Sequence, residues 1–192
     1  MKAFLTENKA LLVFLGWAFG LLIAWVMLDA FFHDAIMRVH YVLIEGQTNI
    51  AVWLLEVFGY SVHAEYGIPG YMSWIQVEGS PGVYVGSGCS GLELFLIFAG
   101  FILIIKGNLK HKFWFVPAGL AIILILNIIR IATLAAIVYH APEYLDFNHK
   151  YTFVFIVYGV ILLLWWWWVK KGQRAGGGEQ SARSREQRAR SK

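Results

Sequence analysis

The sequence predicts an all-α integral membrane protein: a polytopic helical bundle of about four spans, with an additional amphipathic or re-entrant helix and a small β-hairpin on its outer face. Of the 192 residues, 59% are hydrophobic and only 15% are charged, and the mean hydropathy is +0.60. Soluble domains have about 45–50% apolar and about 25% charged residues. Several apolar runs also reach the length of a membrane span, about 20 residues. The same composition excludes a disordered, collagen-like or disulfide-stapled chain.

The four apolar runs cover residues 10–32, 89–105, 113–139 and 152–169. The first follows Lys2 and Lys9 and lacks a small-residue cleavage site, so we expect it to remain as an anchor rather than to be removed as a signal peptide. Residues 41–60 are a possible fifth span. Because they contain several polar and acidic side chains, they fit an amphipathic helix packed on the bundle better than a lipid-exposed span.

Charge predicts the orientation. Residues 170–192 carry a net charge of +6, which leaves −2 for residues 1–169. Four spans place this tail on the same side as the lysines of the amino terminus and of the loop at 106–112, which puts both termini in the cytoplasm by the positive-inside rule. Five spans would instead put the amino terminus outside. A basic tail beside apolar spans indicates topology in the lipid bilayer rather than nucleic-acid binding.

We therefore expect a multi-pass protein of the inner (cytoplasmic) membrane with one membrane-embedded domain over residues 1–169. Residues 170–192 form a basic cytoplasmic tail, which its glycine-rich stretch predicts to be disordered. On the outer side, residues 71–78 and 83–86 flank Gly79-Ser80-Pro81-Gly82 and predict a short hairpin that leads into Cys89.

Counting along the helices places three reactive side chains at one depth. Cys89, Arg130 and His149 lie 17, 18 and 21 residues from the lysine at the inner end of their respective spans. At about 1.5 Å per residue these separations are roughly 26–32 Å, close to the top of a hydrocarbon core about 30 Å thick. His140 lies further from its lysine and is expected to end its helix above the membrane. His149 is therefore the better partner for Cys89.

Each of the three side chains suits a role in acyl transfer. Cys89 falls at the expected amino terminus of a helix, where free N–H groups favour a thiolate, although a lone cysteine is more often a buried structural thiol. Arg130 interrupts an apolar run, where a charge is expensive, and Asn127 one turn earlier can accept a hydrogen bond from it. A guanidinium stabilises a developing oxyanion, and His149 can serve as general base and acid. No cofactor or metal site is predicted, since the histidines lack metal-ligand spacing and no phosphate-binding glycine loop is present.

Cys89-Ser90-Gly91-Leu92, the segment from Asn127 to Ile131, and His149 ahead of the last span together resemble the exosortase/archaeosortase family, in particular its short bacterial members. The resemblance covers roughly residues 10–170. It implies a membrane-embedded cysteine protease or transpeptidase with Cys89 as nucleophile, Arg130 as thiolate partner and oxyanion stabiliser, and His149 as general acid and base. Ser90, Gly91 and Asn127 would support them.

The resemblance also implies the substrates. They would be secreted, membrane-anchored proteins whose carboxy-terminal sorting signal comprises a short motif, a transmembrane helix and a basic cluster. Cleavage at the outer face would give a thioacyl-enzyme, and the product would pass to an acceptor.

Two alternatives remain open. The protein could be a non-enzymatic scaffold or assembly partner in which Arg130 pairs with Glu93, or a membrane acyltransferase that uses Cys89 on lipid-linked substrates. Glu93, four residues after Cys89, would oppose a thiolate if its carboxyl group is ionised.

Overall fold

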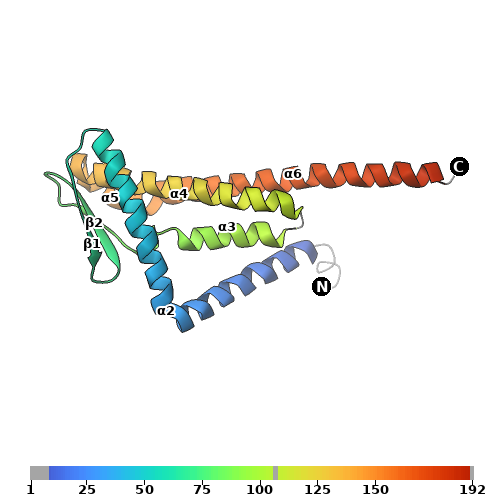
Figure 1. Ribbon diagram of the computed structural model, residues 1–192, viewed down its shortest axis with the longest axis horizontal. Helices are drawn as coiled ribbons and strands as arrows, with labels where there is room; N and C mark the ends of the chain where they lie inside the picture. Colours follow the sequence, from blue (N-terminus) through green and yellow to red (C-terminus); the bar gives the residue numbers. More distant parts are fainter. Residues whose placement is uncertain (1–8, 106–107, 191–192) are drawn as a thin grey trace.

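The computed structural model describes residues 9–105 and 108–190 and is mostly helical (Figure 1). The long helices are α2 (Lys9–Val57), α3 (Leu92–Ile104), α4 (Leu109–His140) and α6 (Phe153–Arg190). Short helical turns are η1 (Ser87–Cys89), η2 (Pro142–Tyr144), α5 (Leu145–Phe147) and η3 (Asn148–Thr152), and the strands are β1 (Val62–Ile68), β2 (Met72–Val77) and β3 (Val83–Val85).

Helices α3, α4 and α6 lie side by side and form the bundle (Figure 1). Their shared core contains Phe98 and Ile102 from α3, Ile123 from α4, and Ile161 from α6. Close packing depends on Gly119 of α4, because a Cβ atom there would overlap the Phe98 ring. The segments Leu109–His140 and Pro142–Lys171 are long and apolar enough to cross a membrane, whereas α3 is a shorter apolar helix. It begins at Leu92, three residues later than the run predicted from residue 89, because Gly91 interrupts the helical backbone.

Residues 41–60 do not form a separate element. Residues 41–57 belong to the second half of α2, a 49-residue helix with a kink at Phe32. In Figure 1 this half runs across the bundle at the end that carries the sheet. Its buried side chains recur every three or four residues, as in a helix with one face packed on a core: Ile36, His40, Ile44, Gln47, Ala51 and Leu55. The face packs on α4 and on the sheet, which agrees with the amphipathic interpretation.

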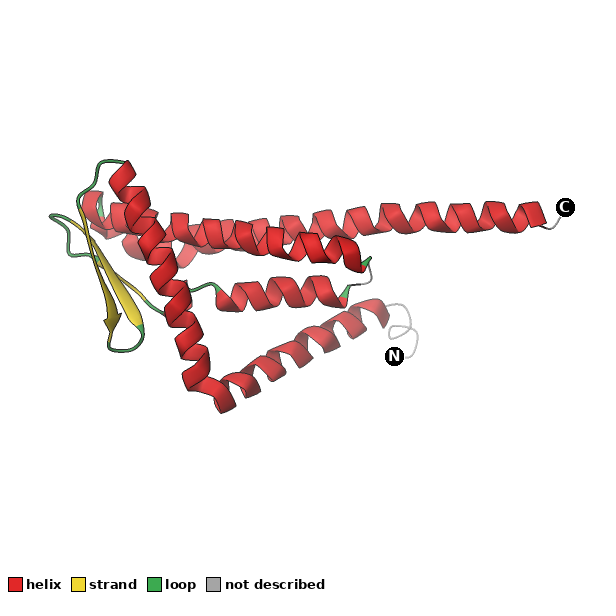
Figure 2. Ribbon diagram, in the orientation of Figure 1, coloured by secondary structure: helices red, strands yellow, loops and turns green. Residues whose placement is uncertain are grey.

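The sheet contains one more strand than the predicted hairpin. Strands β2 and β3 pair antiparallel across residues 79–82, and β1 pairs antiparallel with β2, giving the order β1-β2-β3. Figure 2 shows the strands in yellow at one end of the molecule. Ile75, Val77 and Val85 turn inward onto α2 and α4. Strand β1 alternates between partly buried and exposed residues, and Val62 on its partly buried side packs on this core. The period-two pattern of residues 62–68 was the available signal for this strand, and the sequence prediction missed it.

At the opposite end, α6 continues as a helix through Arg190, whereas the sequence predicts disorder after the last span. Glutamate, glutamine, alanine and arginine, which favour helices, predominate after the glycine-rich stretch. Lys170 and Lys171 each place their Nζ over a tryptophan ring, 4.5 Å from the centroid of Trp166 and 4.8 Å from that of Trp167. Such cation–π pairs are typical of side chains at a membrane surface.

Candidate active site

Cys89 is the last residue of the 3-10 helical turn η1 and lies ahead of α3. We call residues Gly86–Gly91 the Cys89 turn. The Cys89 amide donates to the Gly86 carbonyl at 2.8 Å and the Ser90 amide to the Ser87 carbonyl at 3.0 Å. Gly91 then adopts a left-handed backbone with φ of 76°, and α3 begins at Leu92. Cys89 therefore precedes α3, so Glu93 does not lie one turn further along the same helix as Cys89.

Three side chains from two helices fix this turn. Asn127 of α4 donates its amide to the Cys89 carbonyl at 3.1 Å. Gln47 of α2 donates to the Ser90 carbonyl at 2.7 Å, and His40 Nδ1 lies 2.7 Å from the Ser90 hydroxyl. The side chains of His40, Gln47, Ser90 and Asn127 are all buried. Because an unpaired polar group is costly in the interior, these bonds specify one position for the turn.

Replacement of Gly91 by alanine is expected to displace the Cys89 turn. A Cβ atom at Gly91 would overlap the Asn127 amide, and the left-handed backbone alone costs a non-glycine residue about 1–2 kcal/mol. Thermal unfolding in detergent should show a lower midpoint, and the rate of Cys89 alkylation should change. Gly88→Ala is the matched control, because a Cβ atom there meets nothing within 4 Å. Equal behaviour of the two variants would contradict this account of the turn.

His149, 60 residues further along the chain than Cys89, faces the thiol. Its Nε2 lies 3.9 Å from the Cys89 Sγ, and both side chains are partly buried. His149 belongs to η3, a single π-helical turn that precedes α6; such turns are frequent at functional sites. His140, the alternative histidine, is the last residue of α4, as predicted, and pairs at 2.8 Å with the Tyr60 hydroxyl instead.

Arg130 lies on α4 one turn after Asn127. Its charge is close enough to the His149 imidazole for the two groups to interact. Its Nε is buried, and no described residue accepts a hydrogen bond from it. The bond anticipated between Asn127 and Arg130 is not formed, because the Asn127 amide is directed at the Cys89 carbonyl and its Oδ1 is likewise without a partner among the described residues.

The pair of Arg130 with Glu93 is not formed either within the described part of the chain. The Glu93 carboxylate lies 3.8 Å from the His40 Nε2. The scaffold alternative therefore lacks the contact on which it was based.

His40 and Gln47 are the site residues that sequence reasoning missed. Both lie on the buried face of α2, seven residues apart, and reach the Cys89 turn across 50 and 43 residues of sequence. The available signal was a polar residue recurring at helical spacing within an otherwise apolar face.

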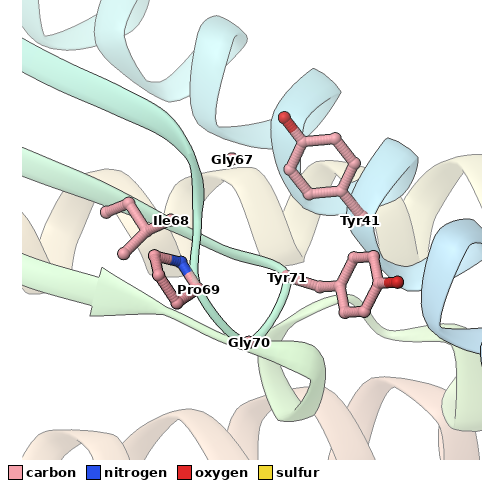
Figure 3. Close-up of a pocket in the computed structure, with 6 residues that line it drawn as sticks. All are labelled: Tyr41, Gly67, Ile68, Pro69, Gly70 and Tyr71. Atoms are coloured by element: carbon pink, nitrogen blue, oxygen red, sulfur yellow. The ribbon is translucent and has the colours of Figure 1, made fainter.

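A cavity of about 330 Å³ lies between α2 and the turn that joins β1 to β2 (Figure 3). It is lined by Tyr41, Gly67, Ile68, Pro69, Gly70 and Tyr71. The rings of Tyr41 and Tyr71 meet edge to face, with centroids 6.3 Å apart. Tyr41 directly follows His40 on α2, and Met72, next to Tyr71, packs beside Gly86: a Cβ atom on Gly86 would lie 3.7 Å from its side chain.

Comparison with known proteins identifies the family. The family model described as transmembrane exosortase matches residues 9–167, which include all the residues that hold or face the Cys89 turn. No curated protein and no solved structure matches the chain. The match covers most of the chain and agrees with its long apolar helices. The chain is therefore a membrane protein that belongs to the transmembrane exosortase family, a family of membrane proteases and transpeptidases.

Proposed function

We propose that this protein is a cysteine transpeptidase that cleaves the carboxy-terminal sorting signal of membrane-anchored proteins and transfers the product to an acceptor. The observation that carries the proposal is the 3.9 Å approach of Cys89 Sγ to His149 Nε2 beside the charge of Arg130. A thiol and an imidazole in contact are the minimum for nucleophilic acyl transfer, and the guanidinium adds the positive charge that an oxyanion requires.

The reaction follows from these three groups. His149 takes the Cys89 proton, and the thiolate attacks the carbonyl carbon of the scissile peptide bond. The resulting oxyanion is stabilised by the positive charge of the Arg130 guanidinium. The carbon–nitrogen bond then breaks, the amine leaves with the proton from His149, and a thioester remains on Cys89. An acceptor amine, a hydroxyl or water gives its proton to His149, attacks the thioester and releases the thiolate.

The membrane arrangement belongs to the same proposal. Four crossings with both termini in the cytoplasm put the Cys89 turn at the outer face of the inner membrane. The basic composition of residues 170–192 supports this orientation. A sorting signal with its own transmembrane helix would present its cleavage motif at that depth.

Capture of the thioester tests the function. The purified protein is mixed with a reporter that carries the carboxy-terminal segment of a membrane-anchored protein from the same organism, and the reaction is quenched with acid. We expect a peptide adduct on Cys89 that hydroxylamine removes, detected by mass spectrometry. Cleavage of the reporter without any such adduct would contradict the mechanism. A lipid-derived acyl adduct would instead support the acyltransferase alternative.

A further inference from the structure

We propose that His40 is a positioning residue that connects Glu93 to Ser90 and thereby holds the Cys89 turn in its reactive arrangement. The inference rests on the proposed function but concerns residues to which that mechanism gives no role. Its basis is a chain of contacts between α2 and the Cys89 turn.

The chain of contacts runs from the α3 backbone to a carboxylate. The Leu92 amide donates to the Ser90 hydroxyl at 3.2 Å. That hydroxyl lies 2.7 Å from His40 Nδ1, and His40 Nε2 lies 3.8 Å from Glu93 Oε1. Glu93 itself lies in the first turn of α3, so the chain closes on the helix from which it started.

One tautomer of His40 satisfies every contact. With the proton on Nε2, the imidazole presents an N–H to the Glu93 carboxylate and leaves Nδ1 free to accept from the Ser90 O–H. The Ser90 oxygen then accepts from the Leu92 amide. In all three contacts the donor comes from the residue on the Leu92 side and the acceptor from the residue on the Glu93 side. A carboxylate that accepts from the second ring nitrogen is the usual means of fixing a histidine tautomer.

A serine, a histidine and a carboxylate in this order also resemble a hydrolase triad, but burial favours positioning over nucleophilic attack. Ser90 has no exposed surface, and its backbone carbonyl accepts a hydrogen bond from Gln47. His40 is only 4% exposed. A substrate carbonyl cannot reach this hydroxyl, whereas the neighbouring Cys89 is partly exposed.

The consequence concerns the geometry of Cys89. Gln47 and His40 together restrain Ser90 through both its carbonyl and its hydroxyl, and Asn127 restrains the adjacent Cys89 carbonyl. Loss of the His40 contact would remove the restraint on the Ser90 hydroxyl. Because a displacement of about 1 Å can cost about 100-fold in rate, the effect should fall on the chemical step and not on substrate binding.

Steady-state kinetics of reporter cleavage by the full-length protein in detergent test the inference. His40→Ala should lower kcat about 100-fold and leave KM within about two-fold of the wild-type value. His40→Asn places an amide at the position of Nδ1 and keeps the bond to Ser90, so it should recover most of the lost kcat. His40→Gln reaches toward Glu93 but not Ser90 and should resemble the alanine variant. This contrast separates positioning from a general loss of structure.

Cys89→Ala in the same assay separates failure of this inference from failure of the proposed function. If Cys89→Ala remains active, the function itself is wrong. Two outcomes would overturn the positioning role while leaving the function intact. In the first, Cys89→Ala is inactive but His40→Ala cleaves at the wild-type rate. In the second, His40→Asn is no more active than His40→Ala and His40→Gln.

If His40→Ala does not fold, Ser90→Ala provides the second test, because it removes only the hydroxyl. Ser90→Ala should show the same loss of kcat, and a wild-type kcat in this variant would overturn the inference. So would labelling of Ser90 by a fluorophosphonate, a serine-nucleophile reagent.

Discussion

Replacement of Cys89 by alanine is expected to abolish processing, with a loss of at least about 10⁴-fold in kcat, the scale seen when an enzyme loses its nucleophile. Cys89 is the only cysteine in the chain, so no second thiol can substitute for it. Cys89→Ser should be almost as inactive, because a hydroxyl at the same place is a much weaker nucleophile than a thiolate. The measurement is the rate at which a co-expressed reporter is shortened, with equal amounts of each variant inserted in the membrane.

Ser87→Ala is the matched control for this loss. Ser87 belongs to the same turn as Cys89, and only its backbone carbonyl takes part in the hydrogen bonds that close the turn. Its alanine variant should process the reporter within about three-fold of the wild-type rate, as is usual for a surface substitution away from a packed contact. Full processing by Cys89→Ala would exclude the thiol as nucleophile. A loss in Ser87→Ala as severe as that in Cys89→Ala would attribute the effect to the turn and not to the sulfur.

The juxtaposition of Cys89 and His149 was within reach of the sequence because a helix has a constant rise. Counting residues from the inner lysines gives depth, and depth was enough to separate His149 from His140. Depth does not say which face of a helix meets its neighbour. It could not indicate that Asn127 would bond to the Cys89 carbonyl and not to Arg130, since both groups lie at nearly the same level.

The contacts of α2 could not be predicted for a different reason. His40 and Gln47 reach Ser90 only because α2 bends at Phe32 and its second half crosses the bundle. That path depends on packing against α4 and the sheet, which no local pattern encodes. Glu93 shows how one local feature alters an inference: the left-handed backbone of Gly91 separates Cys89 from α3, so a spacing of four residues does not bring the carboxylate onto the face of the thiol.

Replacement of Arg130 by alanine is expected to lower kcat about 10²–10³-fold, the effect of removing one oxyanion donor. Arg130→Lys should recover only part of the activity, because an ammonium retains the charge but not the planar arrangement of N–H groups. The measurement is kcat for reporter cleavage, with equal amounts of each variant in the membrane. An unchanged kcat in Arg130→Ala would remove Arg130 from the mechanism.

The scaffold alternative predicts that replacing Arg130 lowers the yield of folded protein and not the rate of a reaction. If Arg130 were structural through a pair with Glu93, Arg130→Gln and Glu93→Gln would reduce the yield of folded protein to a similar extent, measured by size-exclusion chromatography in detergent. Glu93 lies against His40, with a side chain 44% exposed, so we expect Glu93→Gln to fold with nearly wild-type yield. No described carboxylate forms an ion pair with Arg130, so a purely structural role would leave its charge uncompensated within the apolar helix α4. Stabilisation of an oxyanion that exists only during the reaction accounts for that cost.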